Sequence, residues 1–208
     1  FQRDTAFQLA LRLTMRRILA TLAVVALLFS AGSAWADWDD GVAAYKRGDY
    51  VTAYQEFRPL AEQGDAKTQF NLGIMYANGV GVTENDTEAV QWYHKAAVQG
   101  YADAQASLGF MFDNGEGVPV NDAQAVKWYR KAAVQGHAHA QNNLGVMYST
   151  GEGVPVNNVK AYMWWSLAME QGYENVATYL DIIKKQMTPT QIAKAQKLAA
   201  EMWEKINN

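Results

Sequence analysis

The sequence predicts an all-α protein, an α/α solenoid of stacked helix hairpins. Three observations predict this fold. Glycine, leucine and tryptophan recur every 36 residues, each period carries two stretches with apolar residues at helical spacing, and glycines separate those stretches. A period of roughly 20–50 residues is typical of repeat proteins, because a unit of that size buries its apolar face only by stacking on a neighbour.

The repeats are similar enough in sequence to define the boundaries of each unit. Aligning residues 65–100 with 101–136 gives 21 identities in 36 positions, and aligning 101–136 with 137–172 gives 18. We therefore divide the chain into a segment at 1–36, a hairpin at 37–64, three repeats at 65–172 and a C-terminal helix pair at 173–208.

Each repeat is predicted to hold two helices. The first, at about 66–78, places Leu72, Met75 and Tyr76 on one side. Its Gly73 costs ~1 kcal/mol within a helix, which indicates that a neighbouring aromatic ring lies against the backbone there. The loop after it begins with a glycine that can adopt the left-handed conformation of a helix end. The second helix is expected to begin with an N-cap at Asp86, Asp122 and Asn158 in the three units.

The residues that we assign to this scaffold occupy matching positions in successive units. They are Leu72, Gly73, Tyr76, Gly79, Gly81, Ala89, Trp92 and Gly100 in the first unit, Leu108, Gly109, Gly115, Gly117, Trp128 and Gly136 in the second, and Leu144, Gly145, Gly151, Gly153, Trp164 and Gly172 in the third.

The repeated pattern is A-x-x-Q-x-x-L-G-x-M-Y-x-x-G-x-G-V followed by A-V-x-W-Y-x-K-A-A-x-Q-G. It closely resembles the Sel-one-like repeat, a branch of the tetratricopeptide-type solenoids, and all three units match it. The resemblance implies a right-handed superhelix of helix hairpins and a role in protein–protein scaffolding. Relatives of this kind act in envelope signalling, polysaccharide production or host contact.

The flanking segments depart from the repeat. Residues 41–50, followed by Ala53 and Phe57, resemble an ordinary tetratricopeptide hairpin with a short turn. After the third repeat we expect one helix at about 174–186 and then a final helix. Thr188 to Gln191 has the pattern of a capping box with proline at the first helical position. We interpret the final helix as a cap over the last open apolar surface.

Residues 1–36 have the pattern of a secretory signal peptide. Met15-Arg16-Arg17 is basic, Thr21 is the only polar residue in 18–29, and Ala34-Trp35-Ala36 matches a cleavage site. We expect cleavage after Ala36 and a periplasmic or secreted protein. An uncleaved anchor is the alternative, although the apolar run is short of the ~20 residues that a membrane span needs.

Composition excludes several classes of function. The 208-residue chain is 50% hydrophobic and 19% charged, which suits a globular core rather than disorder. Residues 1–36 hold four of its 18 basic residues and one of its 21 acidic residues, so residues 37–208 carry a net charge of −6, unfavourable for nucleic acid. The chain has no cysteine, which excludes disulfides, thiolate zinc sites and a cysteine nucleophile.

We expect a partner to bind the concave face, which the first helices of the hairpins line in the resembled fold. Residues there vary between units while the scaffold does not, and they mix amides with apolar groups, a combination suited to an extended peptide. The predicted partner-binding residues are Lys67, Phe70, Asn71, Ile74 and Asn78, then Asp103, Ser107, Phe110, Asp113 and Asn114, then His139, Asn142, Asn143, Val146 and Ser149.

Other chemistry finds little support. His137 and His139 are two positions apart, whereas a helical metal face needs four, so we predict no metal and no cofactor. The Gly-x-Gly loops lack the lysine and spacing of a phosphate loop, and no serine-hydrolase motif occurs.

The sequence therefore predicts an exported, non-enzymatic adaptor for a protein or peptide. The alternative is a protein that binds or hydrolyses cell-wall glycan or a β-lactam, suggested by the aromatic content and by relatives. A third possibility is self-assembly through the Tyr45/Tyr50 end or the Met202/Trp203 cap.

Overall fold

The computed structural model describes residues 37–208, and the predicted signal peptide lies outside the described residues. This part is helical and contains no strand, which confirms the predicted all-α solenoid. Its helices are α2 (Trp38–Lys46), α3 (Tyr50–Glu62), α4 (Ala66–Asn78), α5 (Asp86–Val98), α6 (Ala102–Asn114), α7 (Asp122–Ala133), α8 (Ala138–Thr150), α9 (Asn158–Glu170), the 3-10 helix η1 (Glu174–Val176), α10 (Ala177–Lys184) and α11 (Pro189–Asn207).

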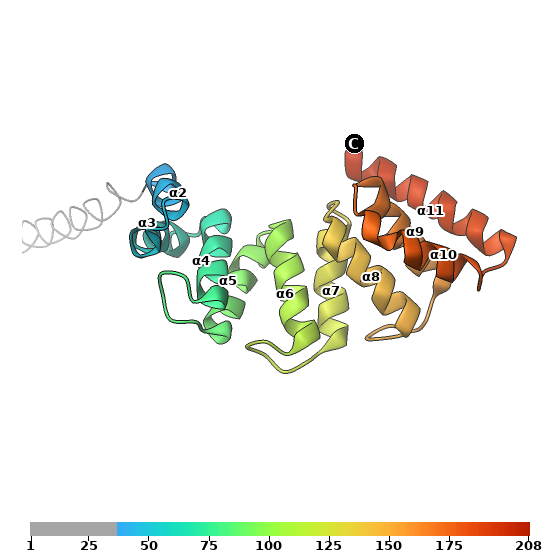
Figure 1. The fold of residues 1–208 in the computed structure, drawn as a ribbon, viewed down its shortest axis with the longest axis horizontal. Helices are drawn as coiled ribbons and strands as arrows, with labels where there is room; N and C mark the ends of the chain where they lie inside the picture. Colours follow the sequence, from blue (N-terminus) through green and yellow to red (C-terminus); the bar gives the residue numbers. More distant parts are fainter. Residues whose placement is uncertain (1–36) are drawn as a thin grey trace, which may run out of the picture.

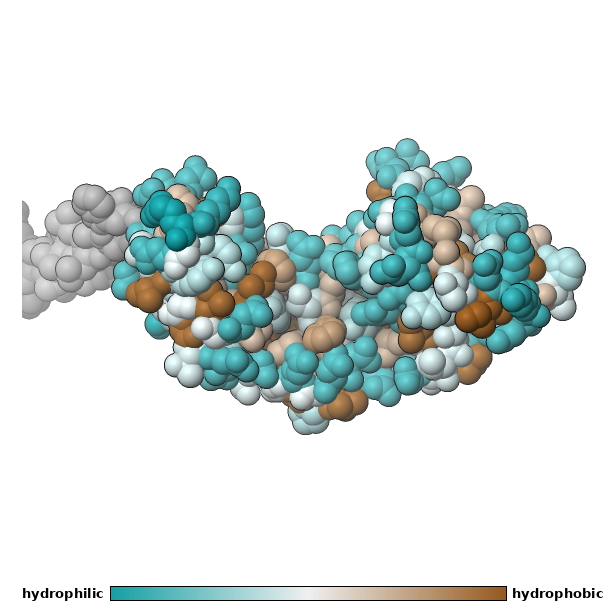
Figure 2. Space-filling model, viewed as in Figure 1, coloured by the Kyte–Doolittle hydropathy of each residue, from teal (hydrophilic) through white to brown (hydrophobic). Residues whose placement is uncertain are grey.

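The hairpins stack in sequence order into an arc (Figure 1). Each helix packs against the one before it and the one after it, from α2 to α9. Because α6 also contacts α8 directly, these first helices of successive hairpins approach one another on the inner side of the curve. Figure 2 shows the resulting hollow between the two raised ends of the molecule.

The second helices begin one residue earlier than the sequence predicted. The N-caps are Asn85, Asn121 and Asn157, and each side chain accepts a hydrogen bond from the backbone N–H three residues later. The expected caps Asp86, Asp122 and Asn158 are the first helical residues instead. Asparagine and aspartate both cap well, and here the extended backbone at the asparagine decides between them.

Gly73, Gly109 and Gly145 allow an aromatic ring to lie against the first helix, as the sequence predicted. A Cβ atom built on Gly109 would lie 2.6 Å from Cδ1 of Tyr129, inside van der Waals contact. Tyr93 occupies the same position over Gly73, and in the third repeat Trp165 lies over Gly145. The glycine therefore brings the two helices of each hairpin close together.

The second glycine of each loop has a role that the sequence did not reveal. It approaches the start of the preceding second helix, so that a Cβ on Gly117 would lie 2.4 Å from the carbonyl oxygen of Asp86. Gly153 lies in the same way against Asp122. These glycines also have positive φ, 66° and 65°, which other residues rarely adopt. These glycines therefore make contacts between repeats in addition to forming part of the loop after the first helix.

A chain of glutamines joins the hairpins. Gln69, Gln105 and Gln141 are buried, and the side-chain amide of each donates to a carbonyl near the end of the preceding second helix, 2.9–3.0 Å away. Each of them also accepts a hydrogen bond from a glutamine 30 residues later, at 2.7–2.8 Å. The amide nitrogen and the amide oxygen of each buried glutamine therefore both have a hydrogen-bond partner.

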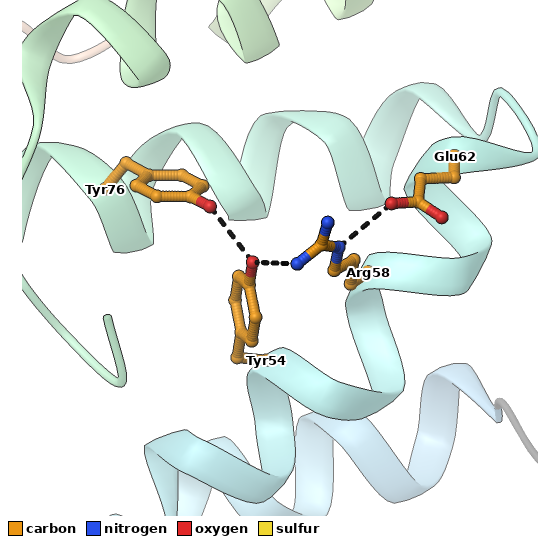
Figure 3. A network of polar contacts seen from close by, with 4 residues as sticks. All are labelled: Tyr54, Arg58, Glu62 and Tyr76. Atoms are coloured by element: carbon orange, nitrogen blue, oxygen red, sulfur yellow. Dashed lines mark hydrogen bonds and ion pairs between the residues drawn. The ribbon is translucent and has the colours of Figure 1, made fainter. Parts of the chain in front are cut away.

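A second polar contact ties the N-terminal hairpin to the first repeat (Figure 3). Arg58 pairs with Glu62 and donates to the Tyr54 hydroxyl, which lies 3.0 Å from the hydroxyl of Tyr76. Burial and the Tyr54 hydroxyl raise the pKa of Tyr76 to about 12, so it remains a hydrogen-bonding phenol at physiological pH. Between the second and third repeats, Arg130 of α7 donates to the hydroxyl of Tyr148 of α8 at 2.8 Å.

The recurring tryptophans are part of the core. Trp92, Trp128 and Trp164 are buried, as predicted from their spacing, so they offer no exposed platform for sugar stacking. On the solvent side, the ammonium groups of Lys95 and Lys131 lie over the rings of Trp92 and Trp128, at 3.6 and 4.2 Å from the ring centres. These two lysines are therefore held against their own helices.

The C-terminal end differs from the expected single helix at 174–186. It forms η1 and the short α10, and Tyr179 of α10 stacks on Trp165 at 5.3 Å between ring centres. The tryptophan that replaces tyrosine in the third repeat thus meets a ring from the cap. Helix α11 begins with the predicted capping box at Thr188 and packs against α9. None of the helices within residues 37–208 combines the length and apolar character needed to cross a membrane.

Candidate functional site

A groove of about 640 Å³ lies on the first helices of the repeats, and we call it the inner groove. Helix α6 runs along its middle, with α4 and α8 on either side, and α5 and α7 each contribute a tyrosine between them. Its lining is Phe70, Ala77, Asn78, Tyr93, Asp103, Ala106, Ser107, Phe110, Met111, Glu116, Tyr129, His137, His139, Ala140 and Asn143.

Phenylalanines supply the apolar part of the groove. Phe110 of α6 is 47% exposed, a high value for a large apolar side chain on a helix with a buried opposite face. Phe70 of α4 is half-buried, because its ring packs against Tyr93 and Tyr101 with centres 5.7 and 5.2 Å apart. Phe110 is therefore the exposed apolar anchor, whereas Phe70 belongs partly to the core.

The two tyrosines of the groove differ in their partners. Tyr129 donates a hydrogen bond to the carboxylate of Asp113, at 3.3 Å. The residue that matches Asp113 one repeat earlier is Ala77, whose side chain has no acceptor. Burial raises the pKa of both Tyr93 and Tyr129, so both hydroxyls keep their protons. The Tyr93 hydroxyl is thus a donor that a ligand in the groove can use.

Carboxylates stand at both ends of α6. Asp103 lies in its first turn, 3.4 Å from Nε2 of His137, and Glu116 lies in the loop after its end. His137 is the N-cap of α8, and burial lowers its pKa while Asp103 opposes that change. Because the imidazole is mostly neutral at pH 7, it leaves the negative charge of Asp103 largely unpaired.

The structure brings together about half of the predicted partner-binding residues. Those that line the inner groove are Phe70, Asn78, Asp103, Ser107, Phe110, His139 and Asn143. Lys67, Asn71 and Ile74 instead line a separate depression of about 270 Å³ with residues of the N-terminal hairpin. There, the Lys67 ammonium lies 4.0 Å from the ring centre of Trp38.

The other predicted residues line neither depression. Val146 packs against the core, and Ser149 donates to the carbonyl of Val146. Asn114 bonds back to its own helix, and Asn142 donates to Asn143. Asp113 lies behind the groove as the acceptor of Tyr129. Their helical spacing placed them on the inner side, but local hydrogen bonds and packing occupy their side chains.

Four groove residues that carry a hydroxyl, carboxyl or imidazole group escaped the sequence analysis: Tyr93, Tyr129, Glu116 and His137. The tyrosines come from the second helices and reach the groove over Gly73 and Gly109, a geometry that the spacing within one helix does not show. Glu116 recurs one period later as Glu152, as scaffold residues do, so its position gives no sign of a binding role. Within residues 37–208, no group of three or more histidine, aspartate or glutamate residues is placed to hold a metal ion.

Comparison with known proteins identifies the repeat. The Sel1 repeat family matches residues 66–101, 102–137 and 138–173, which is more than half of the chain. The chain belongs to the Sel1 repeat family. Proteins of this family are generally non-catalytic scaffolds for protein interaction, the class that the sequence predicts.

Two solved structures share the fold. A Sel1 repeat protein from Oxalobacter formigenes is 37% identical with a TM-score of 0.66, over 68% of this chain and 58% of that one. A protective antigen of uropathogenic Escherichia coli strains that displays an SLR fold is 35% identical with a TM-score of 0.68, over 74% of this chain and 33% of that one. Both likenesses support the Sel1 solenoid.

Two curated relatives are named exopolysaccharide production negative regulators. The one from Rhizobium leguminosarum bv. viciae is 42% identical over 53 residues, and the one from Rhizobium meliloti (strain 1021) is 43% identical over 53 residues. Each match covers 26% of this chain and 20% of the relative. The chain therefore matches about a fifth of the length of these regulators.

Proposed function

We propose that the protein is an exported adaptor that holds a protein or peptide partner in its inner groove, within the cell envelope. The observation that carries the proposal is the groove itself. It crosses the first helices of three consecutive repeats, and its lining varies from repeat to repeat on a scaffold that does not. In repeat proteins such extended inner surfaces are the usual place for a partner.

The envelope location rests on the pattern of residues 1–36, with its basic start, apolar run and Ala-x-Ala site. A regulatory role is supported by the names of the two rhizobial relatives, which are similar to this chain over 53 residues. We therefore propose that the bound partner is a component of an envelope regulatory system, and that the protein acts by holding it rather than by chemistry.

Site-specific crosslinking tests the groove. A photoreactive amino acid at Phe110, which is exposed within the groove, should capture a discrete partner in cells that produce the full-length protein. The matched control is the same amino acid at Val98, which is 59% exposed on α5 and lies outside the groove. Equal capture from both positions, or a partner captured only from Val98, contradicts the use of the groove.

Fractionation tests the location. The full-length protein should appear outside the cytoplasm and shortened by its leader, and deletion of residues 18–29 should retain it in the cytoplasm. A full-length protein that remains cytoplasmic contradicts export, and an uncut protein in the membrane fraction supports the anchored alternative.

A further inference from the structure

The charged residues that line the inner groove indicate which charge a partner should carry. Among residues 37–208, no lysine or arginine lines it, and its two carboxylates, Asp103 and Glu116, stand at opposite ends of α6. The apolar contact surface lies between them, at Phe110. A groove with this lining attracts cations and repels carboxylates, and the effect is stronger where the walls exclude water.

Asp113 stands behind the groove, where it accepts a hydrogen bond from Tyr129. Burial raises the pKa of Asp113, and the nearby charges of Glu152 and Asp122 raise it further, so the surroundings disfavour its charged form. The negative charge of the groove therefore rests on Asp103 and Glu116, which line it.

The positive charges of the repeats lie elsewhere. Lys95 and Lys131 cover tryptophan rings on the second helices, and Lys67 covers Trp38 in the separate depression. They are therefore not placed to neutralise Asp103 and Glu116.

The two carboxylates set a spacing. Asp103 and Glu116 flank the length of α6, and at 1.5 Å per residue the helix separates their backbones by roughly 18 Å. An extended peptide advances ~3.3 Å per residue, so roughly five residues span that distance. The Tyr93 hydroxyl and the amides of Asn78 and Asn143 can bond the peptide backbone along the way.

We propose that the inner groove selects a basic polypeptide segment, with one lysine or arginine near Asp103, another near Glu116 and an apolar side chain against Phe110. This inference rests on the proposed function, since it names the chemistry of the partner that the groove holds. An acidic or phosphorylated segment meets two carboxylates there and is excluded.

Selection from a random library of 12-residue displayed peptides tests the preference without assuming a sequence. The target is the protein recovered from cells that express the full-length gene. Peptides retained equally by Ser107→Trp, which fills the middle of the groove, are subtracted. Circular dichroism checks that each variant is folded. We expect the remaining peptides to be enriched in lysine and arginine around an apolar residue.

Charge variants then locate the preference. The double variant Asp103→Asn, Glu116→Gln should bind a selected basic peptide about tenfold more weakly at low salt, and less so at high salt, because screening weakens half-exposed charge pairs. Phe110→Ala should weaken the binding of basic and neutral peptides to the same extent. The double variant Glu201→Gln, Glu204→Gln is the matched control: it removes two charges from the exposed side of α11, outside the groove, and should leave binding unchanged.

The experiment distinguishes failure of the charge preference from failure of the proposed adaptor function. Peptides that depend on the groove but show no excess of basic residues overturn the charge preference and leave the adaptor function standing. The same holds if the double variant binds basic peptides as tightly as the parent. If no peptide is retained in preference to Ser107→Trp, the groove does not bind polypeptide, and the proposed function falls together with this inference.

Discussion

The Gln105 side chain reaches out of its own repeat: its amide nitrogen lies 2.9 Å from the carbonyl oxygen of Ala97, in the hairpin before it. That carbonyl belongs to the last turn of α5, where it also accepts a hydrogen bond from the backbone N–H of Gly100, at 3.1 Å. Gln105 is 4% exposed, so the bond lies inside the junction. One side chain thus adds a second hydrogen bond to a helix end and joins two repeats.

Replacing Gln105 with alanine should destabilise the fold by about 2–3 kcal/mol, because it removes the two hydrogen bonds of a buried side chain and leaves a cavity at the junction. Gln135→Ala removes only the exposed partner of Gln105 and should cost less than ~1 kcal/mol. Urea unfolding of both variants measures the difference. Similar losses in the two variants would show that the buried bond to Ala97 contributes little.

Gly109→Ala should also destabilise the protein, by about 1–3 kcal/mol, although alanine favours helices more than glycine by ~1 kcal/mol. The new methyl group would meet the ring of Tyr129, which lies across the glycine. Ser107→Ala, in the same helix but half-exposed, has no such contact and is the control. Thermal unfolding should separate the two variants, and a Gly109→Ala protein as stable as its parent would contradict the close packing.

Most of the fold follows from the sequence, because the period and the apolar stripes repeat three times with little variation. The close approach at Gly73 could also be predicted, since a glycine inside a helix needs a reason. The role of Gln105 could not, because its partner Ala97 lies eight residues back in another hairpin and a backbone carbonyl leaves no mark on the sequence. The N-caps were misplaced because Asn85 and Asp86 are both good capping residues.

The candidate site was predictable only in part. Phe110 and Asn143 follow from helical spacing and exposure, and both line the groove. Val146 has the same spacing but is packed against the core. The sequence shows which face a residue occupies, but not how deep the neighbouring helices bury it.

His137 predicts a dependence of stability on pH. Burial lowers its pKa in the folded protein below the ordinary 6.5, so its contribution is intact above pH 6.5 and is lost as the pH falls through the lowered value. His137→Asn keeps an N-cap without a titrating group. Its stability relative to the parent, measured by urea unfolding, should increase between pH 7.5 and 5.5.

Asp103 provides the check on that assignment, since its charge raises the pKa of His137. With Asp103→Asn present, the loss of parental stability on acidification should be larger. A difference between parent and His137→Asn that does not change with pH would show that the imidazole is not the group responsible.

Asp113 predicts the opposite dependence. Burial raises its pKa above the ordinary 3.8, so the folded protein favours the protonated form and loses stability as the pH rises through the raised value. Asp113→Asn should therefore be more stable than the parent at pH 7, and the advantage should shrink as the pH falls toward 3.8. Chemical unfolding across this range measures it.

The hydroxyl of Tyr129 opposes this effect, because its hydrogen bond favours the carboxylate. In a Tyr129→Phe background, Asp113→Asn should give a larger gain at pH 7. An advantage that persists unchanged at low pH would point to packing rather than ionisation.

The glutamine chain and the second loop glycines connect each repeat only to the one before it and the one after it. The packing of a repeat does not require the arc to close on itself, so the number of repeats can change. A duplicated copy of residues 101–136 would present to both neighbours the contacts that they already make. Tandem duplication or loss of one repeat would therefore change the length of the solenoid, and with it the number of residues that a partner can contact. The packing of the core within each repeat would stay the same.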